Sequence, residues 1–98
     1  MNPLELEEKI VDWAIQRGID KASPHKQMLK VTEEVGELAG SIAKGNEAAT
    51  IDAIGDVLVT VLILSYQLEL NPWECLESAY NEIKDRKGKN VDGVFVKE

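Results

Sequence analysis

The chain has 98 residues, which is enough for one domain with one hydrophobic core. Its hydrophobic fraction of 44% indicates a folded globular protein rather than a disordered one. The formal net charge of −7 argues against binding to duplex nucleic acids or anionic membrane surfaces, because both require a basic footprint. Carboxylates that converge in such a chain would instead suit a metal ion.

The single cysteine and the absence of targeting signals predict a cytoplasmic protein. One cysteine, Cys75, rules out an internal disulfide and a cysteine-rich zinc site, and we expect it to be buried. The first ten residues, MNPLELEEKI, are acidic and lack the apolar region of a signal peptide. The longest apolar run, VLVTVLIL, is too short to span a bilayer.

Helix start signals divide the chain into four segments. Asn-Pro or Ser-Pro pairs at positions 2–3, 23–24 and 71–72 combine a capping side chain with a proline that favours the first helical turn. Glycines 18, 45 and 88 follow the apolar-periodic stretches and are typical helix stops. We therefore expect helices over about residues 3–17, 24–44, 47–70 and 72–87. Residues 88–98 are expected to form a docked extended arm or a frayed tail.

These segments predict an all-α fold: a four-helix bundle in a single domain over residues 1–98, with a short C-terminal extended tail. The third helix is apolar on nearly every side from Ile54 to Leu64, as expected of a helix that several neighbours bury. In so small a domain, another subunit must cover part of this surface. We therefore expect a homodimer or a homotetramer.

Two acidic pairs accompany the core positions of the second and third helices. Glu34 and Glu37 are three residues apart, which makes them neighbours on a helix, and Glu33 lies four residues before Glu37. Asp52 and Asp56 are four residues apart and project from one face of the next helix. Antiparallel packing would bring the two pairs to one level. Four oxygen donors on rigid helices suit a hard cation such as Mg²⁺ or Mn²⁺.

A structural alternative remains open at this point. Lys30 can pair with Glu34, four residues later, while the aspartates cap helices or form ion pairs. Two buried aspartates without partners would be very costly, so they must be protonated, paired or bound to metal. A di-iron site is excluded because it requires Glu-x-x-His pairs, and His25 is the only histidine.

The acidic segments and the four-helix pattern resemble the MazG-like all-α nucleoside triphosphate pyrophosphohydrolases, a superfamily that includes the all-α dUTPases and the dCTP pyrophosphatases. Members carry EExxE on one helix and ExxD on the next. EEVGE at positions 33–37 matches the first motif fully. In DAIGDVL, Asp56 takes the aspartate position, Ala53 stands where glutamate is expected, and Asp52 is the obvious substitute. The resemblance runs from about Trp13 to the end of the fourth helix.

This resemblance implies hydrolysis of (d)NTPs to a monophosphate and pyrophosphate, in the service of nucleotide-pool house-cleaning. It also implies Mg²⁺, with Mn²⁺ as a substitute, held by Glu34, Glu37 and Asp56 with Asp52 as the fourth ligand. Glu33 would orient or deprotonate the attacking water, or would contact the metal ligands without binding the metal itself. Glu33 and the metal ligand Glu34 are therefore the candidate catalytic residues. The metal would neutralise the triphosphate and activate water, and no covalent nucleophile is needed.

Because a triphosphate is strongly negative, positively charged side chains are expected near an acidic site that binds one. The segment KDRKGK forms a basic cluster of Lys84, Arg86, Lys87 and Lys89, and Asn81 lies one turn before it. A purely structural explanation of this cluster is that its positive charge stabilises the C-terminus of the fourth helix. Further candidates are Trp13, which can stack on a base, and the residues around the start of the second helix. These are His25, Lys26, Gln27 and Lys30, each weighed against packing, capping or a solvated face.

Three functions follow from these patterns. The leading hypothesis is a Mg²⁺-dependent nucleoside triphosphate pyrophosphohydrolase that acts as a homo-oligomer, with no nucleic-acid or membrane partner. The second is a catalytically weak MazG-like helical oligomer that binds nucleotides or regulates, which Ala53 favours. The third is a plain oligomerisation module whose acidic residues are surface charge.

Overall fold

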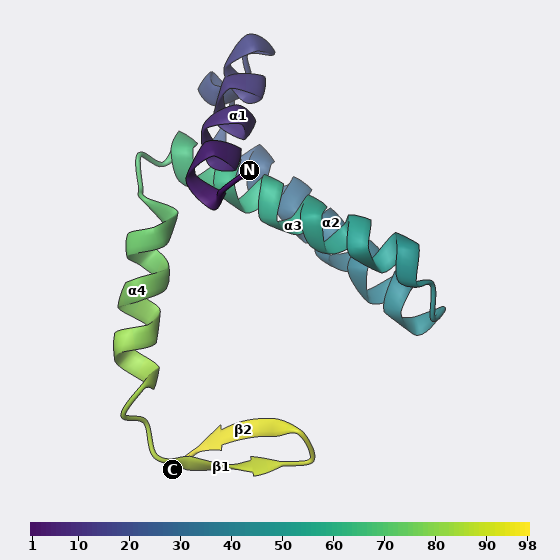
Figure 1. Cartoon of the computed structure of the whole chain (residues 1–98), viewed down its shortest axis with the longest axis vertical. Helices are drawn as coiled ribbons and strands as arrows, with labels where there is room; N and C mark the ends of the chain where they lie inside the picture. The colour runs from purple at the N-terminus through teal and green to yellow at the C-terminus, as the bar shows by residue number, and fades with distance from the viewer.

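A computed structural model describes residues 1–98, the whole printed sequence. Its elements follow one another along the chain as shown in Figure 1. They are α1 (Pro3–Gln16), the short 3₁₀ helix η1 (Ile19–Lys21), α2 (Pro24–Ala43), α3 (Glu47–Gln67), α4 (Pro72–Ile83), β1 (Gly88–Val91) and β2 (Val94–Lys97). The prediction of a mainly helical fold is confirmed.

The helices begin where their capping residues place them. Asn2, Asn46 and Asn71 each accept hydrogen bonds from backbone N–H groups of the first turn, which otherwise lack partners. Ser23 precedes α2 in an extended conformation but makes no such bond. The helix ends lie earlier than expected, most clearly for α4, which stops at Ile83 instead of residue 87.

The helices α2 and α3 form an antiparallel pair, and α1 lies across α3 (Figure 1). Gly45 lies in the turn between α2 and α3 and has φ +65°, a conformation that a glycine adopts without strain. Contacts among these three helices bury Ala14, Val31, Ala53 and Ile63. The core is therefore small, since only seven of the 98 residues are buried.

The helix α4 stands away from the other three helices and carries the strands at its far end (Figure 1). The four helices consequently do not close into a bundle within one chain. Cys75 is exposed, and the expectation that it is buried is wrong because no element of the same chain covers α4. The position of α4 is the main feature that the sequence patterns did not predict.

The C-terminal tail is a β-hairpin, not an extended arm or a frayed end. Strands β1 and β2 pair antiparallel, with Val91 opposite Val94. Asp92 and Gly93 form the two-residue turn with φ of +51° and +84°, the positive values that favour a tight hairpin. The side chain of Phe95 lies over Gly88, where a Cβ atom would have no room.

The helix α3 is only partly covered. Its residues Ala53, Thr60 and Ile63 are buried against α1 and α2, but the rest of its apolar surface is largely open. By length and composition alone α3 could cross a membrane, with a mean hydropathy of 1.8 over its most apolar window. The core helix of a soluble protein meets the same criterion, so this property calls for a covering partner without identifying it.

Candidate functional site

A cleft of about 210 Å³ lies where α1, η1, α2 and α3 meet. It combines an apolar side with a lysine and two carboxylates. Its lining residues are Trp13, Ile19, Gln27, Lys30, Glu34, Asp56, Val59, Thr60 and Ile63. Five of them, Trp13, Gln27, Lys30, Glu34 and Asp56, are candidate site residues from the sequence, and the fold brings these five together.

Three glutamates of α2 converge beside this cleft. A carboxylate oxygen from each of Glu33, Glu34 and Glu37 lies within 4.8 Å of the others. Glu34 is only 6% exposed, and its Oε2 atom is buried without a hydrogen-bond partner. A buried carboxylate oxygen without a partner is costly, and a hard cation with oxygen ligands would satisfy it. These residues therefore fit a divalent metal ion such as Mg²⁺.

Lys30 neutralises part of this negative charge. Its Nζ atom lies 3.2 Å from Oε1 of Glu34 and 3.4 Å from Oε1 of Glu33. The hydrogen bond to Glu34 and the nearby charge of Glu33 raise the pKa of Lys30 above its ordinary value, so the ammonium group stays charged. The Lys30–Glu34 ion pair, which we expected if the acidic residues were purely structural, is present. It leaves the second oxygen of Glu34 without a partner.

The pKa of Glu37 reflects the negative charge that Lys30 does not neutralise. The negative charge of nearby Glu34 raises the pKa of Glu37 above the ordinary value of a glutamate. Like charges at short range disfavour the ionised form, which is why a proton is held more tightly here. A bound cation would relieve the same repulsion.

The two aspartates of α3 differ in position. Both aspartates are exposed, but Asp56 lines the cleft together with Glu34, whereas Asp52, one turn earlier, is not among the lining residues. The expectation that both are buried is wrong, because α3 is covered on one side only. Ala53 is buried between the helices, at the position where the family motif has glutamate.

The apolar side of the cleft contains Trp13, which is 45% exposed instead of being a core residue. The guanidinium carbon of Arg17 lies 4.3 Å from the centre of its ring, a cation–π contact. Gln27 donates a hydrogen bond from Nε2 to the backbone oxygen of Thr60 at 3.1 Å, which ties α2 to α3 within the cleft. The half-exposed indole thus offers a flat surface for an aromatic ligand.

The other candidate substrate residues lie outside the cleft. His25 and Lys26 are exposed at the start of α2 and do not line it. Asn81 lies on the polar face of α4 with Glu74, Glu77 and Ser78. The basic cluster of Lys84, Arg86, Lys87 and Lys89 follows α4 and is separated from the acidic residues of its own chain.

Sequence patterns missed four lining residues of the cleft, Ile19, Val59, Thr60 and Ile63, and one residue that stacks on its tryptophan, Arg17. Arg17 could have been found from its spacing, since it lies four residues after Trp13, directly after the end of α1. Ile19 could not, because only the fold places η1 beside α3, where the amide of Gln67 donates to the Ile19 carbonyl at 2.9 Å.

The fold and the cleft define a helical protein with a carboxylate-rich site between two antiparallel helices. A family model for the MazG nucleotide pyrophosphohydrolase domain matches residues 22–90. Since this range covers more than half of the chain, the protein belongs to the MazG family of nucleotide pyrophosphohydrolase domains. The matched range includes α2, α3 and α4, and with them Glu33, Glu34, Glu37, Asp52 and Asp56.

One relative comes from a bacteriophage. Over 64 residues the chain is 38% identical to an uncharacterized 18.2 kDa protein of the rep-hol intergenic region of Haemophilus phage HP1 (strain HP1c1). This alignment covers 64% of the chain but only 39% of the phage protein, so the chain spans about two fifths of that relative's length. No solved structure matches the chain.

The raised pKa of Glu37 predicts that any stabilisation by Mg²⁺ depends on pH. Because the folded state holds the Glu37 proton more tightly than the unfolded state, this group favours folding at low pH and loses that contribution as pH rises through the raised pKa. A bound Mg²⁺ would compete with the proton for the same oxygens. We expect saturating Mg²⁺ to raise the melting temperature clearly at about pH 7.5 and hardly at all at about pH 4.5.

Thermal unfolding with and without Mg²⁺ at the two pH values measures this difference. K⁺ at the same ionic strength is the control, because it screens charge without binding tightly to a carboxylate cluster. An equal Mg²⁺ effect at both pH values would contradict the expectation.

Proposed function

We propose that the protein is a Mg²⁺-dependent nucleoside triphosphate pyrophosphohydrolase that converts a (d)NTP and water into a (d)NMP and pyrophosphate. The observation that carries the proposal is the buried, unpartnered oxygen of Glu34 in a cleft that also holds Asp56, Lys30 and a half-exposed tryptophan. Family membership supports the same reaction class. A role in clearing unwanted nucleotides from the pool would follow from this reaction.

The acidic residues would hold the cation. Glu34 and Glu37 on α2 and Asp56 on α3 supply oxygen ligands, and Asp52, one turn before Asp56, would complete the set at the edge of the cleft. When bound, Mg²⁺ or Mn²⁺ neutralises triphosphate charge, polarises a phosphoryl oxygen and lowers the pKa of water. Glu33, exposed beside Glu34, would orient the attacking water and accept its proton.

The remaining residues would bind the nucleotide. Lys30 already lies against the acidic residues and would contact a phosphate that approaches the metal ligands. Trp13, with Arg17 stacked on its ring, would support the base. Gln27 keeps its side-chain oxygen available in the cleft while its nitrogen is bound to Thr60.

Pyrophosphate release by the purified protein tests this function across the eight common (d)NTPs with Mg²⁺. Glu37→Gln and Asp56→Asn are each expected to lower turnover by at least about 100-fold, because each removes a metal ligand. Asp52→Asn is expected to lower it by only about 10-fold, since Asp52 lies outside the cleft. Absence of turnover with every nucleotide would refute the enzyme, and unchanged rates in the Glu37 and Asp56 variants would refute the site.

A second candidate function is a MazG-like helical oligomer that binds nucleotides without efficient hydrolysis. The buried Ala53, together with the position of Asp52 outside the cleft, favours it, because the carboxylate that the family motif has at position 53 is missing. This candidate predicts Mg²⁺-dependent nucleotide binding by calorimetry with no pyrophosphate release. Detectable turnover that disappears in Asp56→Asn would exclude it.

A further inference from the structure

The amide of Gln27 has a fixed orientation in the cleft. Its Nε2 atom donates a hydrogen bond to the backbone oxygen of Thr60 at 3.1 Å. A backbone carbonyl only accepts hydrogen bonds, so the amide nitrogen must face Thr60 and the amide oxygen must point away from it. That oxygen accepts no hydrogen bond from the chain and is not buried. Gln27 therefore offers a free acceptor to a ligand in the cleft.

Thr60, which also lines the cleft, has no free donor either. Its hydroxyl donates a hydrogen bond to the backbone oxygen of Val57 at 2.9 Å, within α3. A hydroxyl has one hydrogen and two lone pairs, so only acceptor positions remain on this oxygen. The indole N–H of Trp13 lies in the plane of its ring and cannot reach a base that stacks on the face of that ring. The cleft thus presents acceptors, and no free uncharged donor, to a base stacked on Trp13.

These two acceptors lie at one level of the cleft and the carboxylates at another. Gln27 is seven residues before Glu34 on α2, or about 10 Å along the helix axis. Thr60 is four residues after Asp56 on the antiparallel α3, or about 6 Å in the same direction. If the phosphates meet the carboxylates, as the proposed function requires, the base lies at the level of Gln27 and Thr60. This placement of the base rests on the proposed function.

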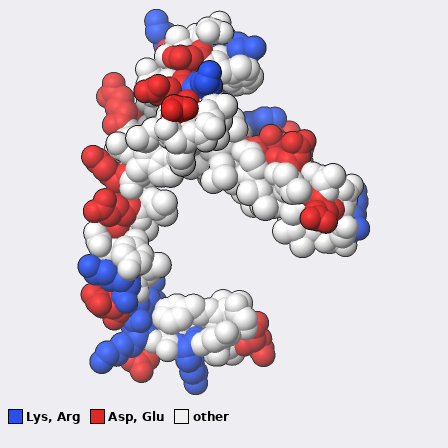
Figure 2. Space-filling view, viewed as in Figure 1, with Lys and Arg blue, Asp and Glu red and all other residues white.

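Charge cannot distinguish one base from another. Acidic side chains lie on α1, on the α2–α3 pair and on α4 alike (Figure 2). Every nucleoside triphosphate carries the same phosphates, so Lys30 and the carboxylates would interact with all of them in a similar way. A choice among bases must therefore come from hydrogen bonds to Gln27 and Thr60, because the remaining walls are hydrophobic. These walls are Trp13, Ile19, Val59 and Ile63.

We propose that the cleft selects nucleotides whose base carries an amino group, namely adenine, cytosine or guanine, over those with uracil or thymine. Gln27 is the residue that determines this preference. The amino group of the three favoured bases supplies N–H donors, whereas uracil and thymine have a carbonyl oxygen where cytosine has its amino group. The ring N–H of uracil lies between two carbonyl oxygens, so a pair of neighbouring acceptors meets at least one of them. Opposed acceptors repel each other and both stay unpaired, which is costly away from water.

Binding of uncleavable nucleotides to the wild-type protein tests the preference without reference to activity. The probes are the α,β-imido analogues of dCTP and dUTP, in which nitrogen replaces the oxygen between the first two phosphates and blocks hydrolysis there. Cytosine and uracil have rings of the same size and differ only in the group at C4 and the hydrogen at N3. In calorimetry with saturating Mg²⁺, we expect the dCTP analogue to bind at least about 10-fold more tightly. Equal affinity, tighter binding of the dUTP analogue, or no binding of either would overturn the proposal.

Two substitutions of Gln27 test whether its oxygen is the group responsible. Gln27→Met keeps the length of the side chain and removes both hydrogen-bonding groups. Gln27→Lys keeps a donor for the Thr60 carbonyl, and with it the link between α2 and α3, but has no acceptor. In each variant that melts cooperatively, the ratio of the two affinities is expected to fall to within about 2-fold of one. A folded variant that retains the wild-type ratio would overturn the assignment to Gln27.

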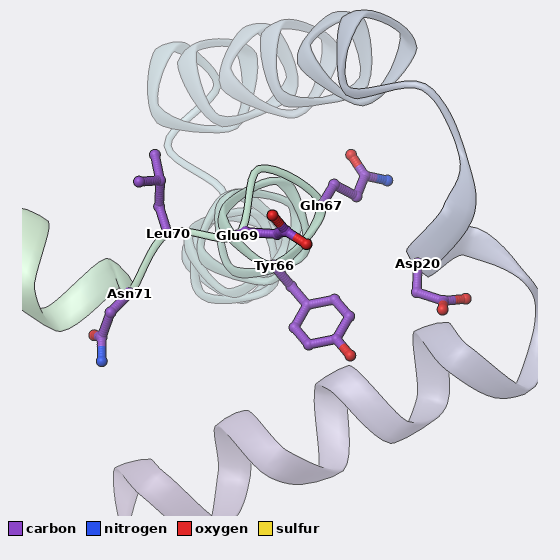
Figure 3. A pocket seen from close by; sticks show the side chains of 6 residues that line it. All are labelled: Asp20, Tyr66, Gln67, Glu69, Leu70 and Asn71. Atoms are coloured by element: carbon purple, nitrogen blue, oxygen red, sulfur yellow. The ribbon is translucent and has the colours of Figure 1, made fainter.

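The matched control is Gln67→Met, which removes a bond of the same kind outside the cleft. Gln67 donates from Nε2 to the backbone oxygen of Ile19 at 2.9 Å and is not a lining residue of the cleft. Figure 3 shows Gln67 near the end of α3, on the side where Asp20 lies. The ratio of the two affinities should equal that of wild type in this variant. Loss of the ratio here as well would mean that the preference depends on how the helices are linked, which would overturn the proposal.

Pyrophosphate release from dCTP and dUTP separates the preference from the proposed function. We expect kcat/KM of the wild-type protein to be at least about 10-fold higher for dCTP than for dUTP. Hydrolysis of both at equal kcat/KM would overturn the preference and leave the proposed function intact. If no nucleotide is hydrolysed, the proposed function fails, while the affinities of the two analogues still decide the preference.

Discussion

Glu34→Gln is expected to lower kcat/KM for the preferred nucleotide by at least about 100-fold. The change keeps the size of the side chain but removes the charge of the one carboxylate that has a buried, unpartnered oxygen. Steady-state pyrophosphate release at saturating Mg²⁺ measures it. The neutral amide removes the repulsion that raises the pKa of Glu37 but also the ion pair with Lys30, so the metal-free variant should remain folded with a stability close to that of wild type.

The matched control for this substitution is Glu8→Gln, which makes the same chemical change at an exposed position on α1. Its turnover is expected to equal that of wild type. If Glu34→Gln retains wild-type turnover, Glu34 is not a metal ligand. If Glu34→Gln unfolds, the ion pair of this carboxylate with Lys30 is required for the fold, and lost turnover is then no evidence for a metal ligand.

Ile63→Ala is expected to lower the free energy of unfolding by about 2–5 kcal/mol. Ile63 is 4% exposed and is the largest of the four buried hydrophobic residues, so its truncation leaves a cavity in a very small core. At about 4–8 °C per kcal/mol for a domain of this size, the melting temperature should fall by about 8 °C or more. Calorimetry at one fixed protein concentration measures the change, because the stability of an oligomer depends on concentration.

Two controls accompany this experiment. Ile63→Val removes a single methylene and should cost about 0.5–1.5 kcal/mol. Ile15→Ala makes the same change as Ile63→Ala at a residue that is 44% exposed on α1, and should cost less than about 1 kcal/mol. Equal losses for Ile63→Ala and Ile15→Ala would mean that the core lies elsewhere, for example between two subunits.

Local signals predicted the helix starts and part of the cleft. Caps and prolines act within one helical turn, which is why the starts of α1, α2 and α4 can be read from Asn2-Pro3, Ser23-Pro24 and Asn71-Pro72. Helical spacing likewise groups Glu33, Glu34 and Glu37, because neighbours on one helix need no tertiary information.

The position of α4 and the exposure of its residues could not be predicted in this way. Whether a helix with an apolar stripe packs on its own chain or on another depends on the short turn before it and on surfaces elsewhere. The burial expected for Cys75 and Asp52 failed for this reason, since each assumed a closed bundle within one chain. The tail showed a turn signal at Asp92-Gly93. The hairpin was still not predicted, because each strand is only four residues long and gives too short a pattern to recognise.

The most direct test of the central proposal is the identity of the products formed from a nucleoside triphosphate, followed by ³¹P NMR. We expect the preferred (d)NTP to yield a nucleoside monophosphate and pyrophosphate, with no diphosphate or orthophosphate, and expect chelation of Mg²⁺ by EDTA to stop the reaction. Glu34→Gln should give neither product at the same enzyme concentration. Formation of a nucleoside diphosphate and orthophosphate, or pyrophosphate release that continues in EDTA, would contradict the proposed function.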